Sequence, residues 1–197
     1  MAARFSDESE FNLFGSDGRL YCRRMPGEEY LLQNVKPVVK YGGGSVTVWG
    51  VVTSDGVGRL HRINGNMDAK QFISILSTSL LDTVLDHHLN PTSIILAQDC
   101  NPKHTSHLAQ AWFQQNHVAL LPWAPSSPDM NIIENVWELL DRRIRRREVR
   151  PRTVDELWEV MQEEWKKIGV EEIQRLYRSM PARVAALKKA RGGYTKY

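Results

Sequence analysis

Cysteine is scarce in this sequence, with only Cys22 and Cys100 among 197 residues. The two lie 78 positions apart and match no metal-ligand spacing, so we interpret both as reduced thiols of an intracellular protein. Runs of about 18 apolar residues are also lacking, so no membrane-spanning helix and no membrane partner are predicted. The N-terminal stretch MAARFSDESE has no apolar core of the kind that a signal peptide needs.

Internal repeats and low-complexity segments are missing as well. Hydrophobic residues make up 42% of the chain and charged residues 25%, as in ordinary globular proteins. A length of 197 residues suits one domain with a substantial core. We therefore predict a single domain over residues 1–197.

Positive charge is unevenly placed, although the net charge is only +3. Residues 142–152 read RRIRRREVRPR, with seven arginines in eleven positions. Such a cluster attracts polyanions through phosphate neutralisation and counterion release. A solvated helix face explains the same cluster equally well, and charge alone does not decide between the two interpretations.

The first half of the chain has the pattern of β-strands. Residues 5–15 and 19–26 alternate in part and are separated by a turn at 16–18. Residues 45–53 are dense in β-branched and aromatic residues, and a turn at 54–56 is expected to join them to residues 57–63 as a hairpin.

The second half changes to the periodicity of helices. Asp68 is predicted to cap a helix that runs to residue 88 and carries apolar residues at three- and four-residue spacings. Alternating helices and strands give an α/β fold with a mixed sheet and helices on its faces. The further elements that we expect are buried strands at 93–99 and 117–121, and helices near 104–116, at about 130–148, at 155–168 and at 170–190, with breaks at Gly169 and Pro181.

Three carboxylates are candidates for chemistry. Asp99 comes at the C-terminal end of a central strand, where open sheets form ligand crevices. Glu134 lies in the first turn of a helix, and Asp7 ends or interrupts the first strand. Each also has a simpler interpretation: Asp99 as a cap of the next loop, Glu134 as a partner of the helix dipole, and Asp7 as a turn residue.

Five segments together resemble the Tc/mariner superfamily of DNA transposases. FSDESEF, GGGSVTVWG, QDCNPKHTS, LPWAPSSPDMNIIENVW and SMPARVAALKKARGGYTKY occur in the order found in that superfamily. The 34 residues between Asp99 and Glu134 match the Tc-type spacing of its second and third acidic residues. The resemblance covers nearly the whole chain, from Phe5 to the terminal TKY.

This resemblance implies an RNase H-like fold, with a mixed five-stranded sheet flanked by helices and extra C-terminal helices. It also implies a DDE triad of Asp7, Asp99 and Glu134 that is both catalytic and metal-binding, with Mg²⁺, or Mn²⁺ in its place. Phosphodiester cleavage by two cations requires carboxylate ligands, and three carboxylates clustered without a cation would repel one another. The implied function is the catalytic domain of a cut-and-paste transposase, which cleaves DNA and transfers the 3′-end during transposition and integration.

Several other acidic residues lie near the triad, and all but one of them are set aside. In an alternating strand, Glu8 and Glu10 would point to the face opposite Asp7. Asp129 is expected to cap the helix of Glu134. Glu138, one helical turn beyond Glu134, is a second choice for the third acid.

Double-stranded DNA, both transposon ends and target, is the implied partner. The arginine-rich segment continues the helix of Glu134, so we expect it to follow a DNA backbone, and Trp123 in the loop beside the site is a candidate for base stacking. His104 is a candidate DNA contact or metal ligand, against a loop or helix-capping role. The DNA-contact candidates are Arg142, Arg143, Arg145, Arg146, Arg147, Lys103, His104 and Trp123.

The sequence departs from the superfamily in a few places. It starts almost at FSDES, so the N-terminal helix-turn-helix modules that bind transposon ends are expected to be absent. Cys100 and Ile132 replace an asparagine and a proline that are usual there. A non-catalytic or domesticated remnant that binds DNA or oligomerises is therefore the alternative, and an RNase H-type nuclease fails on motif order. A nuclear location and a possible homodimer are further expectations.

Overall fold

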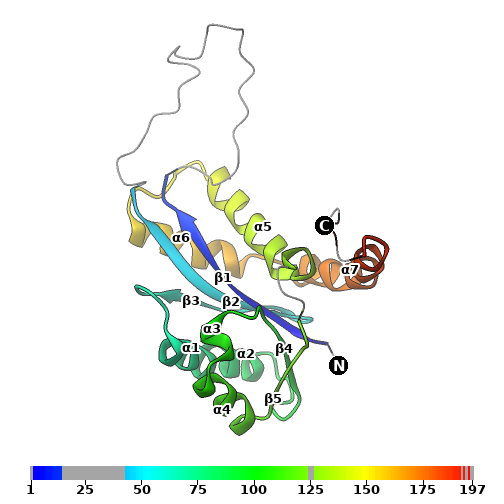
Figure 1. Ribbon diagram of the computed structural model, residues 1–197. Helices are drawn as coiled ribbons and strands as arrows, with labels where there is room; N and C mark the ends of the chain where they lie inside the picture. The colour runs from blue at the N-terminus through cyan, green and yellow to red at the C-terminus, as the bar shows by residue number, and fades with distance from the viewer. Residues whose placement is uncertain (1, 15–42, 124–126, 192, 194, 196–197) are drawn as a thin grey trace, which may run out of the picture.

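A five-stranded mixed sheet forms the centre of the molecule (Figure 1). The computed structural model describes residues 2–14, 43–123, 127–191, 193 and 195. The strands lie in the order β3-β2-β1-β4-β5, with β1, β2 and β3 antiparallel and β4 and β5 parallel to β1. Their bounds are β1 Arg4–Asn12, β2 Ser45–Thr53, β3 Gly56–Ile63, β4 Ile94–Ala97 and β5 Val118–Leu120. The predicted mixed sheet and the hairpin of β2 and β3 are confirmed.

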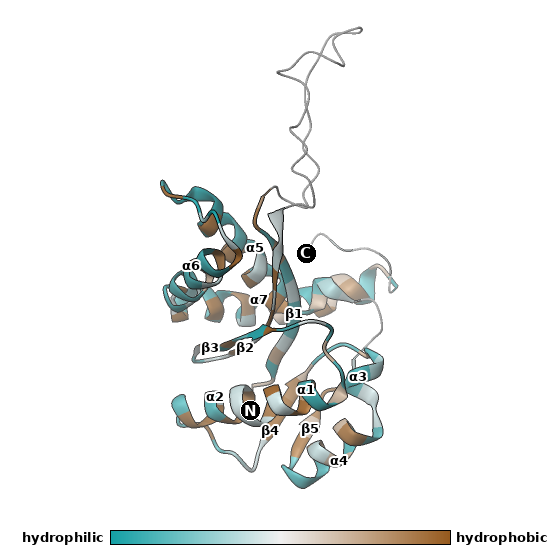
Figure 2. Cartoon of the chain, turned by 90° about the vertical axis from the view of Figure 1, so that its left-hand side faces the viewer, coloured by the Kyte–Doolittle hydropathy of each residue, from teal (hydrophilic) through white to brown (hydrophobic). Residues whose placement is uncertain are grey.

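Helices cover both faces of this sheet (Figures 1 and 2). One core cluster joins the sheet to α1, α2 and α4, and the other joins it to α5, α6 and α7. Figure 2 shows hydrophobic residues along the strands and on the helix sides that meet them. The helices are α1 Ala69–Ile75, α2 Leu81–Asp86, α3 Pro102–Thr105, α4 His107–Gln115, α5 Ile132–Arg146, α6 Val154–Lys166 and α7 Val170–Lys189.

The first long helix forms as its apolar spacing predicts. The Asp68 side chain accepts a hydrogen bond from the Gln71 amide and so caps α1. A π-helical segment, Leu76–Leu80, separates α1 from α2. There the Ser77 and Thr78 hydroxyls donate to carbonyls four residues earlier, a bonding pattern that bends helices. The five apolar residues that define the predicted face are all buried: Phe72, Ile75, Leu76, Leu80 and Val84.

Three local predictions differ from the structure in part or in full. Strand β5 is not a buried strand, because it forms the edge of the sheet and Ala119 and Leu120 are exposed. The helix expected near 104–116 divides at Ser106, whose side chain caps α4. Helix α7 does not break at Pro181, which lies on its exposed side, where water can hydrogen-bond the carbonyl that proline leaves free.

Other expectations have mixed outcomes. The break at Gly169 is confirmed, since this glycine is the N-cap of α7. Cys100 is a free thiol, whereas Cys22 and the strand expected at 19–26 lie outside the described residues. Among the helices that the structure describes, none is both long and apolar enough to cross a membrane.

Candidate active site

Asp7 lies in the middle of the central strand β1 and neither ends nor interrupts it. Its register partner on β2 is Gly50. A Cβ at Gly50 would lie 2.5 Å from Trp137 Cη2, so the absence of a side chain lets α5 approach the sheet beside Asp7. Trp137 also stacks on Trp165, with ring centroids 5.1 Å apart. These contacts set the position of α5 against the strand.

Glu134 is in the first turn of α5, as predicted, and its carboxyl group is hydrogen-bonded to that of Asp7. Burial, followed by repulsion from Glu134, raises the pKa of Asp7 to about 8. Burial also raises the pKa of Glu134 above its ordinary value. Two like charges in contact need a proton or a cation between them, so the pair is a place for positive charge.

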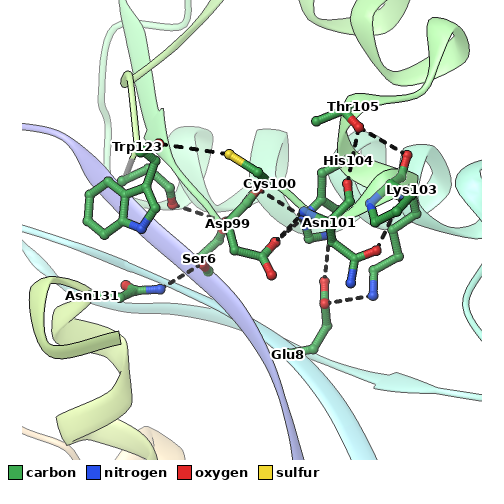
Figure 3. Close-up of polar contacts among 12 residues, drawn as sticks. Ser6, Glu8, Asp99, Cys100, Asn101, Lys103, His104, Thr105, Trp123 and Asn131 are labelled. Atoms are coloured by element: carbon green, nitrogen blue, oxygen red, sulfur yellow. Dashed lines mark hydrogen bonds and ion pairs between the residues drawn. The ribbon is translucent and has the colours of Figure 1, made fainter. Parts of the chain in front are cut away.

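Asp99 follows the end of β4 by two residues. The last paired residues of the β1–β4 ladder are Phe5 and Ala97, so Asp99 lies just beyond the paired part of β4. The Asp99 side chain is 51% exposed. Its Oδ1 lies 2.6 Å from His104 Nδ1 and accepts a hydrogen bond of 3.2 Å from the Asn101 amide (Figure 3). Asp99 therefore presents a carboxylate at the strand end.

His104 is buried behind Asp99, with only 2% of its side chain exposed. Its Nε2 lies 3.0 Å from Glu8 Oε1, and Lys103 Nζ lies 2.9 Å from Glu8 Oε2. Burial alone would raise the pKa of Glu8, but the contacts with His104 and Lys103 hold it below its ordinary value. His104 is thus enclosed between two carboxylates, and in this arrangement its ring is not accessible to DNA.

Glu8 is a functional candidate that is not among the site residues predicted from the sequence. The alternation of β1 correctly placed it on the face opposite Asp7, and this same alternation turns it toward α3. The contact between Glu8 and His104 spans 96 residues of sequence. A buried acid needs cationic or hydrogen-bonding partners, so the neighbouring residues Lys103 and His104 are the sequence signal that could have pointed to the contact with Glu8.

The turn that leads into Glu134 is held by α7. Arg183, 4% exposed, donates to the Asp129 carbonyl and to Asn135 Oδ1, each at 2.7 Å. The prediction that Asp129 caps α5 is wrong, because Asn131 is the N-cap and the Asp129 carboxylate accepts a hydrogen bond from Thr195. Sequence periodicity gave no sign of Arg183, which is an arginine on a helix more than 40 residues downstream.

The fit of this site to divalent cations rests on Asp7 and Glu134. They form a partly buried carboxyl pair of hard oxygen donors, the type that Mg²⁺ and Mn²⁺ prefer. Beside them, Asn131 Nδ2 donates to the Ser6 carbonyl, and Asn131 Oδ1 is buried with no hydrogen-bond partner in the described part of the chain. Within the described ranges, no three His, Cys, Asp or Glu side chains are clustered closely enough to hold a metal. Asp99 therefore does not form a metal-binding cluster with the pair in the described part of the structure.

The five arginines of the predicted DNA-binding segment fall into two groups. Arg143 pairs with Glu172, Arg145 with Asp141, and Arg147 with Glu163 and Glu164. Arg142 and Arg146 are exposed on α5 and make no hydrogen bond or ion pair within the residues that the structure describes. The first group binds the fold together, and the second faces solvent.

Trp123 is half-buried rather than fully exposed. Its ring meets Phe5 edge-on at a centroid distance of 6.1 Å, and its carbonyl accepts a weak hydrogen bond from the Cys100 thiol. The next residues, 124–126, lie outside the described ranges. Base stacking by Trp123 stays a prediction.

Comparison with known proteins gives a consistent result. The family described as DDE superfamily endonuclease matches residues 2–158. The Tc1 transposase of Caenorhabditis elegans is 42% identical over 193 residues, which are 98% of this chain and 69% of that protein. The Tcb1 transposase of Caenorhabditis briggsae is 40% identical with the same coverage.

Solved structures share the fold at lower sequence identity. The Mos1 transposase paired-end complex with left transposon end has a TM-score of 0.80 and 16% identity, and the match covers 98% of this chain and 56% of the Mos1 chain. A structure of the Mos1 transposase catalytic domain with raltegravir and Mg has a TM-score of 0.72 and 14% identity, covering 85% of that chain. These likenesses confirm the RNase H-like fold, and the chain spans little more than half of the longer Mos1 protein.

Proposed function

Because the chain belongs to the DDE superfamily endonucleases, as a catalytic domain of the Tc1/mariner transposase type, we propose that it cleaves DNA at transposon ends and joins the freed 3′-hydroxyls to target DNA. The observation that carries this proposal is the contact between the Asp7 and Glu134 carboxyls, with Asp99 at the end of the adjacent strand. These are the three acids that the resemblance to the superfamily selects.

Divalent cations, Mg²⁺ or Mn²⁺, are part of the proposal. When bound between carboxylates, such cations activate the attacking oxygen and stabilise the leaving oxygen of a phosphodiester. Asp7 and Glu134 would hold them from β1 and the head of α5, and Asp99 Oδ2 is the remaining carboxylate oxygen without a partner among the described residues. The Mos1 structures with Mg and with Mn support this assignment by analogy.

The residues of the chain contribute position and charge. Asp7 and Glu134 are partly buried, and this burial reduces the screening by bulk water of their attraction for a cation. The contact of Glu134 with Asp7 fixes its carboxyl relative to the strand, and Arg183 fixes the turn that precedes it. Substrate phosphates would complete the ligand shell, as is usual for Mg²⁺.

Double-stranded DNA is the proposed partner, and the exposed side of α5 is its proposed contact. Glu138, Arg142 and Arg146 follow Glu134 at four-residue intervals and are all exposed. These positions cover about 18 Å of helix from the site, counted from Glu134 to Arg146 at the rise of an α-helix. Arg142 and Arg146 are therefore the arginines that we assign to the DNA backbone. The Mos1 paired-end complex contains the left transposon end, which supports a DNA partner.

A homodimer and a nuclear location are also proposed. The paired-end form of the Mos1 complexes supports assembly from two copies around two ends. A transposase needs access to chromosomal DNA, which in eukaryotes such as the nematodes of the relatives lies in the nucleus.

The test of the proposed function is cation-dependent DNA cleavage. The wild-type chain is expected to nick and transfer transposon-end DNA in Mg²⁺ or Mn²⁺, whereas Asp99→Ala is expected to lose more than about a hundredfold in rate. Equal rates for wild type and Asp99→Ala would contradict the assignment of Asp99 as a catalytic residue. A remnant without a functional site would show neither cleavage nor thermal stabilisation by Mn²⁺, so the cation titration separates the two candidate functions.

A further inference from the structure

Asp99 is connected to a series of polar side chains that lie between β1 and α3 (Figure 3). Its Oδ1 is 2.6 Å from His104 Nδ1, and His104 Nε2 is 3.0 Å from Glu8 Oε1. Glu8 Oε2 continues the series to Lys103 Nζ at 2.9 Å. Both nitrogens of the His104 ring and both oxygens of Glu8 are thereby in use.

The series of polar contacts from Asp99 through His104 and Glu8 to Lys103 is enclosed by the fold. The side chain of His104 is 2% exposed, that of Glu8 15% and that of Lys103 20%. The His104 ring also packs on Phe72 of α1, with centroids 4.3 Å apart. A ring held at both nitrogens and on one face has a single orientation, so the position of Glu8 determines the position of His104 Nδ1.

We propose that Glu8 and His104 are positioning residues for Asp99. The ring fixes Oδ1 of Asp99 and leaves Oδ2, which has no partner in the described part of the chain, directed away from the ring for a cation. This inference rests on the proposed function, in which Asp99 is a metal ligand. Partners that orient a ligating carboxylate in this way are worth about 10- to 100-fold in metal affinity or activity.

A purely structural role makes a different prediction. If these polar contacts only hold α3 against β1, removing them lowers the stability of the fold and reduces activity equally with any cation. If they orient Asp99, the loss is greater with Mg²⁺ than with Mn²⁺, because Mg²⁺ demands a near-ideal octahedral geometry. The ratio of the rate in Mg²⁺ to the rate in Mn²⁺ therefore distinguishes a role in orienting Asp99 from a purely structural role.

The experiment compares Glu8→Gln and His104→Asn with wild type and with Glu10→Gln. Glu10 lies two residues along the same strand, is exposed, and has no contact with His104. We expect Glu8→Gln to nick DNA about 10- to 100-fold more slowly in Mg²⁺ and to recover part of that loss in Mn²⁺. His104→Asn retains an amide near Nδ1 but does not reach Glu8. Its nicking rate in Mg²⁺ is therefore expected to lie between those of wild type and Glu8→Gln. Glu10→Gln should match wild type.

Thermal unfolding during a Mn²⁺ titration gives a second readout that needs no activity. Wild type and Glu10→Gln should be stabilised at lower Mn²⁺ concentration than Glu8→Gln and His104→Asn, with unchanged affinity for DNA. Equal losses in both cations with an unshifted Mn²⁺ midpoint would overturn the inference and leave a structural tie. If Asp99→Ala has a wild-type Mn²⁺ midpoint, the proposed function fails at Asp99 itself, which is a distinct outcome. Should Glu8→Gln not fold, His104→Asn decides.

Discussion

Asp7 and Glu134 form a carboxyl–carboxyl contact that lowers the stability of the fold when both groups are ionised. Their carboxyls are hydrogen-bonded and partly buried, and neither has a basic side chain among the causes of its pKa shift. Glu8, one residue from Asp7, has the opposite character, because His104 and Lys103 hold its pKa below the ordinary value. Adjacent acids on opposite faces of β1 thus have opposite electrostatics, and the unfavourable one faces the proposed cation site.

Replacing Asp7 by Asn is expected to stabilise the cation-free protein, increasingly so as the pH rises. The pKa of Asp7 is raised to about 8, so the folded state binds a proton more tightly than the unfolded chain. Stability from that proton is present below the ordinary carboxyl pKa near 4 and is lost as the pH rises toward 8. We expect Asp7→Asn to exceed wild type by about 1–3 kcal/mol at pH 8 and by little at pH 4.5, measured by denaturant unfolding in EDTA.

Glu10→Gln is the matched control for this measurement, because Glu10 is exposed on the same strand. Added Mn²⁺ should stabilise wild type and leave Asp7→Asn almost unchanged. Parallel pH dependences for wild type and Asp7→Asn would contradict the like-charge contact.

The elements that carry the site are held by contacts distant in sequence. Gly50 admits Trp137 against β1–β2, and Arg183 of α7 binds the turn before α5. The DDE family match ends at residue 158, whereas α7 spans Val170–Lys189, so this helix supports the site from outside the matched region.

Arg183→Ala should loosen the entry to α5. The guanidinium donates to the Asp129 carbonyl, Asn135 and Ser179, and a buried polar network that loses its charged donor costs on the order of 2 kcal/mol or more. We expect Arg183→Ala to unfold at a lower urea concentration by about that free energy and to cleave DNA more slowly at a temperature where it is still folded. Arg178→Ala, on the exposed side of the same helix, is the control, and an equal midpoint for the two variants would refute the support role.

Element types followed from local sequence, whereas contacts did not. The Asp68 helix and the β2–β3 hairpin form where apolar spacing and turn residues place them, because each depends on neighbours within a few residues. Asp7, Asp99 and Glu134 were found by motif and spacing, and the structure brings two of them into contact. Pro181 shows the opposite case, since the general rule for proline predicted a break, whereas α7 continues through this exposed position. Glu8 with His104 and Arg183 with Asn135 are long-range pairs, which periodicity does not encode.

Across the whole molecule, charge is divided between structure and solvent. The sequence predicts that the whole arginine-rich segment follows a DNA backbone, and charge reversal at residues 145–147 would be one way to test this prediction. Arg145 donates to the Asn12 and Leu13 carbonyls and pairs with Asp141, and Arg147 bridges to α6. Reversal there would disturb packing, so it does not isolate a DNA contact. Arg142 and Arg146, on the exposed line that starts at Glu134, are the informative positions.

Neutralising Arg142 and Arg146 together is expected to weaken binding to any DNA duplex and to flatten its salt dependence. Each lost phosphate contact removes about one unit from the slope of log K against log salt concentration, so the double variant Arg142→Gln/Arg146→Gln should lose about two. The measurement is fluorescence anisotropy on two unrelated duplexes over a salt series. Arg143→Gln is the matched control on the same helix, because Arg143 is engaged by Glu172, and its loss is expected to lower stability while preserving the slope. If the double variant keeps the wild-type slope on both duplexes, α5 is a solvated face and DNA approaches the acidic site from another side.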